Sequence, residues 1–105
     1  MIQPKRLTSA EVEAKIENII SQGGRIILSA HCKNQSMKNR DVIFDDIKNA
    51  LLTGKLIDFE WSDKFNNWIY ELEGKDLEGD KLNCITIFFD STFSMLIVTV
   101  MERGK

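Results

Sequence analysis

The fold class is decided by the stretch LIDFEWSDKFNNWIYELE, residues 56–73. Apolar and polar residues alternate with a period of two on both sides of its turn-rich centre, SDKFNN at 62–67. Such alternation is typical of half-buried strands, and two alternating runs joined by a short polar segment are typical of a β-hairpin. Residues 56–61 and 68–73 are therefore predicted to pair as antiparallel strands.

The hairpin is followed by two more predicted strands. Residues 82–89 and 93–101 are rich in apolar and β-branched side chains, and Asp90-Ser91-Thr92 between them has the composition of a turn. Both runs are apolar on both faces, which is typical of central strands covered by helices. A four-stranded meander is therefore expected from residue 55 onward.

The residues before 55 show helical spacing. Residues 9–22 are predicted to form a helix because apolar side chains recur at i, i+4, i+7 and i+8, namely Val12, Ile16, Ile19 and Ile20. Thr8 and Glu11 have the spacing of a capping box, and Gly23-Gly24 ends the helix. A second helix is predicted at about 44–53, ended by Gly54, and residues 25–29 read as a brief strand.

The expected fold is therefore α+β, with two main helices followed by a four-stranded, largely antiparallel sheet. A length of 105 residues fits one domain, 1–105, and 43% hydrophobic residues place the chain in the globular class. No apolar run approaches the roughly 18 residues that span a bilayer, and the amino terminus lacks a secretory signal. We therefore expect a soluble, cytoplasmic protein with no membrane partner.

The two cysteines indicate neither a metal site nor a disulfide framework. Cys32 and Cys84 are 52 positions apart, and no second cysteine or histidine lies near either at zinc-ligand spacing. We expect two reduced thiols, no metal and no cofactor.

Charge is distributed unevenly along the chain. The formal net charge is −2, but residues 1–40 carry seven cations and three acids, which leaves −6 for the remainder. The window HCKNQSMKNR, residues 31–40, has three cations and no acid. It is the one segment that the sequence marks as a candidate to face an anion.

The order of motifs resembles the DUF4258-type domains. The motifs that carry the resemblance are Ser29-Ala30-His31, Met37-Lys38-Asn39-Arg40, Asp46-Ile47, Gly54, Trp68-Ile69-Tyr70 and LIVTV at 96–100. In outline the chain is also similar to the motility quorum-sensing regulator (MqsR) toxins, and both families are similar to the RelE-like toxin fold. Two positions depart from the pattern: Asp41 stands where the family often has glycine, and Phe44 replaces the usual capping residue.

The resemblance implies the toxin of a type II toxin–antitoxin pair: a metal-independent endoribonuclease on mRNA, free or on the ribosome, neutralised by a cognate antitoxin protein. Such cleavage needs proton transfer and a cation for the phosphorane, because the RNA 2′-OH is itself the nucleophile. His31, the sole histidine, suits the proton role, and Arg40 suits the phosphate. On a regular helix the two residues lie about 180° apart, so a break must bring Arg40 round.

Lys33, Lys38, Tyr70, Lys75 and Arg103 are the predicted RNA-binding residues. Tyr70 could stack an unpaired base, and the resemblance places a cation at Arg103. Each candidate also has a structural interpretation. His31 could cap a helix, Arg40 could pair with a nearby aspartate, the lysines could be merely solvated, Arg103 could lie in a frayed terminus, and Tyr70 could pack in the core. The alternative function is accordingly a non-catalytic RelE-like module that holds a protein partner.

Overall fold

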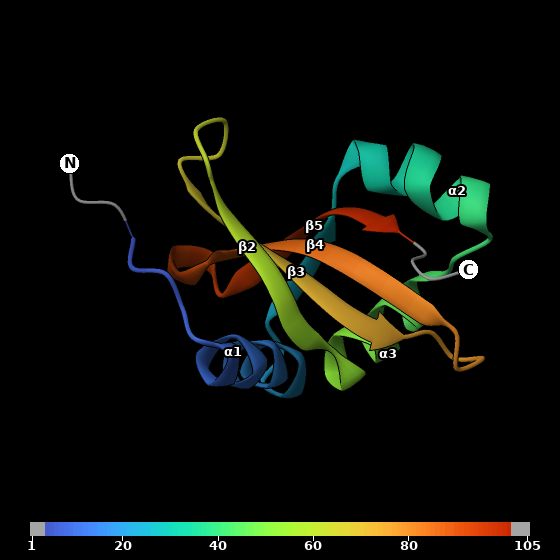
Figure 1. Ribbon diagram of the computed structural model, residues 1–105, viewed down its shortest axis with the longest axis horizontal. Coiled ribbons are helices and arrows are strands. Elements are labelled where there is room, and N and C mark those ends of the chain that lie inside the picture. The colour runs from blue at the N-terminus through green and yellow to red at the C-terminus, as the bar shows by residue number, and fades with distance from the viewer. Residues whose placement is uncertain (1–3, 102–105) are drawn as a thin grey trace.

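The computed structural model describes residues 4–101, and of residues 36 and 40 only the backbone. The elements follow one another along the chain as α1 (Ser9–Ser21), β1 (Arg25–Leu28), the π-helical turn η1 (Cys32–Ser36), α2 (Met37–Arg40), α3 (Phe44–Thr53), β2 (Lys55–Ser62), β3 (Asn67–Lys75), β4 (Lys81–Phe89), the 3₁₀ turn η2 (Asp90–Thr92) and β5 (Ser94–Met101). Figure 1 shows one sheet with α1 and α3 on the same side of it.

The strands form one mixed sheet in the order β1-β5-β4-β3-β2. β2 to β5 make the antiparallel meander, while β1 pairs in parallel with β5, with Arg25 opposite Ser94 and Leu28 opposite Ile97. The α+β class is confirmed, but the four-stranded, largely antiparallel sheet after two helices is wrong. Five strands and three α-helices are present in residues 4–101.

The physical reason for this difference is the position of β1. The strand has only four residues, and its partner lies almost seventy residues further along the chain. Local periodicity carries no information about a pairing over that distance. The place of β1 beside β5 is therefore a feature of the tertiary structure.

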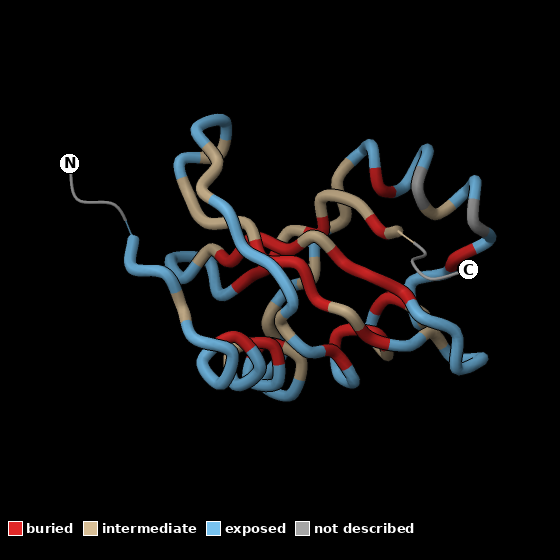
Figure 2. The backbone as a smooth tube through the Cα atoms, viewed as in Figure 1, coloured by how far each residue is buried: buried red, intermediate tan, exposed pale blue. Residues whose placement is uncertain are grey.

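The core lies between the sheet and the two helices α1 and α3, and Figure 2 shows it as a band of buried backbone through the central strands. We call this side of the sheet the covered face and the opposite side the open face; the helix over residues 30–40 lies over part of the open face, where Asn83 and Ile87 are fully buried. Side chains of the covered face include Leu72 on β3, Cys84 on β4 and Val100 on β5, which are aligned by register and fully buried. β4 and β5 therefore lie inside the sheet, as their apolar sequences predict, and bury apolar side chains against the helices.

The predicted start of the first helix is confirmed in detail. The Thr8 hydroxyl accepts from the Glu11 N–H at 3.2 Å, and the Glu11 carboxylate accepts from the Thr8 N–H at 3.0 Å. These hydrogen bonds hold the pKa of Glu11 below its usual value. The second helix begins after Ile43, whose N–H donates to the Asp46 carboxylate at 3.1 Å, so Asp46 caps a helix that lacks a capping residue at its start.

Both cysteines are free, buried thiols. Burial, with a smaller contribution from Cys32, raises the pKa of Cys84 to about 12, and burial also raises the pKa of Cys32. Because the folded-state pKa lies above the unfolded value, this contribution to stability is present below about pH 9 and is lost as pH rises towards about 12. Stability is therefore expected to fall over that alkaline range.

Thiol reactivity tests the burial of both cysteines. Iodoacetamide is expected to leave Cys32 and Cys84 unmodified in the native protein at about pH 8 and to alkylate both in denaturant, because only exposed thiolates react. Mass spectrometry gives the number of labels. Rapid labelling of Cys84 in the native protein, with far-ultraviolet circular dichroism unchanged, would contradict the buried position.

Candidate functional site

The backbone of residues 30–40 is helical, and Ser29 fixes its start. The Ser29 hydroxyl accepts from the Cys32 N–H at 2.9 Å, as a helix N-cap does, and donates to the Val98 carbonyl at 2.6 Å. Val98 lies at the register shift where β4 and β5 lose regular pairing. The serine of the Ser29-Ala30-His31 motif therefore links the start of the helix to β5 at the position where its pairing with β4 is irregular.

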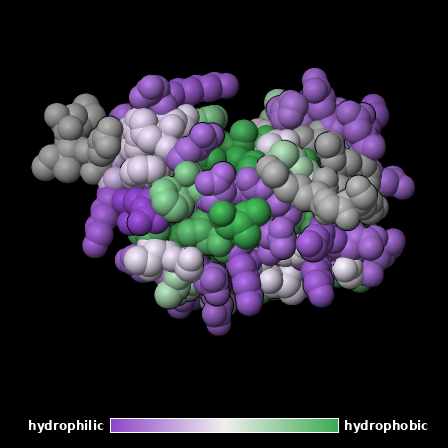
Figure 3. All heavy atoms as spheres, viewed as in Figure 1, coloured by the Kyte–Doolittle hydropathy of each residue, from purple (hydrophilic) through white to green (hydrophobic). Residues whose placement is uncertain are grey.

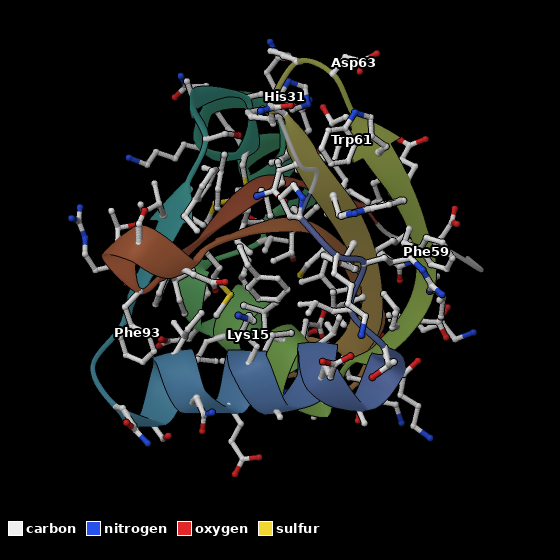
Figure 4. All side chains as sticks on the ribbon, turned by 90° about the vertical axis from the view of Figure 1, so that its left-hand side faces the viewer. Lys15, His31, Phe59, Trp61, Asp63 and Phe93 are labelled. Atoms are coloured by element: carbon white, nitrogen blue, oxygen red, sulfur yellow. The ribbon has the colours of Figure 1, made fainter. Side chains whose placement is uncertain are left out.

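His31 is exposed in the first turn of this helix. Figure 4 places it at the opposite end of the molecule from α1 and Lys15, and Figure 1 places the helix there too. Unpaired N–H groups and the helix dipole make the first turn of a helix favourable for an anion. Lys33 follows two residues later and is also exposed, so the start of the helix can attract a phosphate.

The π-helical turn η1 comes directly after His31. On a regular α-helix the backbone at positions 31 and 40 would face about 180° apart. A π-turn adds one residue without adding a turn, so it rotates the downstream helix by about 100°. The change in helical geometry that would bring Arg40 towards His31 is therefore the π-turn itself. It places the backbone at position 40 within about a quarter turn of position 31.

The helix ends at Asp41, which has a φ of 57°. This left-handed conformation is the one that glycine adopts most readily at a helix end, and aspartate tolerates it better than most residues do. The departure from glycine at this position is therefore compatible with the turn that the family pattern implies.

The structure brings only part of the predicted set together. His31, Lys33 and Lys38 lie on one helix and are exposed. The ion pairs among the side chains of the described residues join Lys15 to Asp90 and Lys81 to Glu73, so neither Lys33 nor Lys38 is held by an acid there. The backbone of residue 40 lies at the end of the same helix.

Two predicted residues lie away from this helix, and a third lies outside the described residues. Lys75 is at the end of β3 beside α3, where its N–H donates to the Thr53 hydroxyl at 3.0 Å. Tyr70 is 2% exposed, and its hydroxyl accepts from the Leu7 N–H at 2.9 Å. Burial raises the pKa of Tyr70 and leaves its ring no surface for base stacking, so the residue packs in the core. Arg103 lies outside residues 4–101.

The sequence reasoning missed an acidic groove on the open face. It encloses about 310 Å³, and its open-face side chains are Asp58, Glu60, Ile69, Glu71, Ile85 and Met101. The sign of these charges makes the open face unfavourable for RNA. Alternation of Asp58 and Glu60 along one strand was the signal available in the sequence.

A β-bulge explains how the acids reach this face. The register shifts between Leu56, opposite Leu72, and Asp58, opposite Glu71, which leaves Ile57 as the extra residue at 48% exposure. A shift of one residue exchanges the two faces of a strand. The covered face thereby receives Phe59 and Trp61, and the open face receives the carboxylates.

A second hollow of about 360 Å³ lies between α1 and the turn that joins β4 to β5. Lys15 on α1 and Asp90 on the turn form an ion pair at its edge, and Phe93 in its wall has a φ of 46°. Neither this hollow nor the acidic groove is lined by His31.

Side chains that could hold a metal do not gather anywhere in the part of the chain that the structure describes. Across the same residues, no helix combines the length and the apolar character needed to cross a membrane.

The family model described as "Domain of unknown function (DUF4258)" matches residues 28–102. The match begins at the end of β1 and includes the capped helix, α3 and the whole meander, while α1 lies before it. No curated protein and no solved structure matches the chain.

Proposed function

We propose that this chain, which belongs to the DUF4258 family, is a metal-independent endoribonuclease acting on mRNA. The observation that carries the proposal is the exposed His31 in the first turn of a helix whose exposed lysines have no acid partner among the described residues. The resemblance to MqsR and RelE-like toxins supports the further assignment as the toxin of a type II pair, acting on free or ribosome-bound mRNA and bound by a cognate antitoxin.

In this mechanism the RNA lies along residues 30–40. The 2′-OH attacks the adjacent phosphate, and a 2′,3′-cyclic phosphate forms as the bond to the 5′-oxygen breaks. The 2′-OH loses its proton and the leaving 5′-oxygen gains one; His31 transfers one of these protons and water exchanges the other, while Arg40 stabilises the negative charge of the phosphorane. Lys33 and Lys38 hold the flanking phosphates, with the salt dependence that such contacts confer.

The acidic open face favours a second candidate function, a non-catalytic module that holds a protein partner. Asp58, Glu60 and Glu71 share one groove, whose described lining residues include no lysine or arginine. A nuclease that bound RNA across its sheet would need the opposite charge. The two candidates therefore assign different surfaces to the ligand.

Cleavage of a defined RNA by the purified protein, with and without ribosomes, tests the proposal. Cleavage is expected to persist in EDTA, and induction of the gene in cells is expected to arrest growth. Replacing both Lys33 and Lys38 by alanine is expected to raise KM and flatten its salt dependence, whereas replacing the exposed Lys48 and Lys64 is expected to change neither. No cleavage by the wild-type protein under either condition would favour the binding module.

A further inference from the structure

We propose that the hollow between α1 and the β4–β5 turn binds a free α-amino acid with an apolar side chain. The hollow lies at the opposite end of the molecule from His31, and α1 precedes the part of the chain that the family model matches. The inference is therefore independent of the proposed cleavage of RNA.

The hollow has the size and the lining of a small-molecule site. It encloses about 360 Å³, within the range of roughly 300–1,000 Å³ that such sites occupy. Leu7, Ile19 and Phe89 contribute apolar surface to its lining. Figure 3 shows mainly hydrophilic atoms on the outer side of α1, at the lower edge of the molecule, so the apolar lining is on the inner side of this helix. The hollow can therefore receive one apolar side chain of moderate size.

Lys15 and Asp90 place charges of opposite sign at the edge of the hollow. They form an ion pair in which the Lys15 side chain is 26% exposed and the Asp90 side chain is 80% exposed. The Lys15 Nζ also lies 6.0 Å from the centre of the Phe88 ring, so the ammonium is held near the sheet while the carboxylate reaches it from the solvent side. An ion pair with an exposed partner contributes little to stability, so a ligand can readily separate the two groups.

This pair of charges favours a zwitterion over a simple ion. An anion alone would be repelled by Asp90, and a cation alone would be repelled by Lys15. An α-amino acid carries its ammonium and carboxylate on one carbon, so it can replace the single contact by two, one to each side chain. Glu11, the third charged lining residue, is engaged elsewhere, because its carboxylate accepts from the Thr8 N–H at the start of α1.

Phe93 is an independent indication that this wall has a function beyond packing. Its φ of 46° is a left-handed conformation that is rare and strained for a bulky residue, yet its side chain is still 42% exposed. Such strain persists where the surroundings fix the backbone, and it is found most often at functional sites. Here the Phe93 carbonyl accepts from the Arg25 N–H, and its N–H donates to the Asp90 carbonyl, both at 3.1 Å. Figure 4 shows Phe93 and Lys15 at the same end of the molecule, both above α1, so a ligand held by Lys15 can cover the exposed ring.

The test is isothermal titration calorimetry of the full chain with L-phenylalanine as the probe. L-Phenylalanine is expected to bind. Hydrocinnamic acid, which lacks the ammonium, and phenethylamine, which lacks the carboxylate, are each expected to bind about tenfold or more weakly, because each leaves one protein charge without its partner.

Variants of the lining locate the ligand. Lys15→Met and Asp90→Asn are each expected to lower the affinity by about tenfold or more. The matched control, Lys48→Met, removes an exposed lysine of α3 and is expected to leave the affinity unchanged. Phe93→Gly is expected to weaken binding while the thermal midpoint changes little, because glycine adopts a positive φ without strain and this offsets the lost contacts of the ring.

Three results would overturn the proposal. No binding of L-phenylalanine by the wild-type protein would show that the ion pair serves only to join the turn to α1. Equal affinity for L-phenylalanine and hydrocinnamic acid would contradict recognition of a zwitterion, and full affinity in both the Lys15 and the Asp90 variant would place the ligand elsewhere. Circular dichroism reports folding of each variant, and because no cleavage is measured, failure here leaves the nuclease proposal to its own test.

Discussion

Replacing Gly74 by alanine is expected to lower the free energy of unfolding by about 3 kcal/mol, the upper end of the range for overpacking a core. A Cβ at this position would lie 1.9 Å from the Ala50 carbonyl oxygen and 2.6 Å from its carbon. Both atoms belong to the backbone of α3, so no side-chain rotation relieves the contact. The helix would have to move away from β3, on which it packs.

Urea unfolding measures this effect, and Gly79→Ala is the matched control. Gly79 has a φ of 89° and nothing within 4 Å of an added Cβ, so the control adds the same methyl group and carries only the backbone strain. That strain is about 1–2 kcal/mol. Equal losses in the two variants would show that α3 does not approach β3 as closely as the structure places it.

Replacing His31 by glutamine, or Arg40 by alanine, is expected to lower RNA cleavage by roughly 10²–10³-fold. The first change removes a proton-transfer group and the second removes a charge that stabilises the phosphorane, and each effect has about this magnitude in other enzymes. His31 is exposed, so its replacement is expected to leave the fold intact.

The readout is the rate of cleavage of a defined RNA by purified wild type and variants. Arg25→Ala, which removes an exposed arginine from β1, is the matched control for Arg40→Ala and is expected to cleave at the wild-type rate. Circular dichroism verifies folding. Wild-type cleavage by both the His31 and the Arg40 variant would remove these residues from the mechanism.

Local patterns predicted the elements well where their stabilising contacts are near in sequence. The spacing of Val12, Ile16 and Ile19 gave α1, and the capping box of Thr8 and Glu11 gave its first residue within one position. The alternation in 56–73 gave the β2–β3 hairpin. Each of these signals acts within a few residues, so the sequence contains the whole cause.

The candidate site was predictable only in part. The exposed cluster of His31, Lys33 and Lys38 follows from one polar window and lies on one helix. Tyr70, chosen for its capacity to stack, instead packs on Phe88 and is buried by the chain before α1. Its neighbours come from distant segments, so the alternation of β3 could not show which face α1 and the residues before it would cover.

The sequence by itself determined the α+β class, two of the helices, the meander and the charge of each segment, because these depend on composition and on contacts between near neighbours. The tertiary structure alone decided the parallel place of β1, the π-turn after His31 and the bulge at Ile57. The parallel place of β1 depends on pairing with a strand almost seventy residues further along the chain, and the bulge depends on the register between β2 and β3. The bulge in particular places Phe59 and Trp61 on the covered face, and the same one-residue shift places Asp58 and Glu60 on the open face.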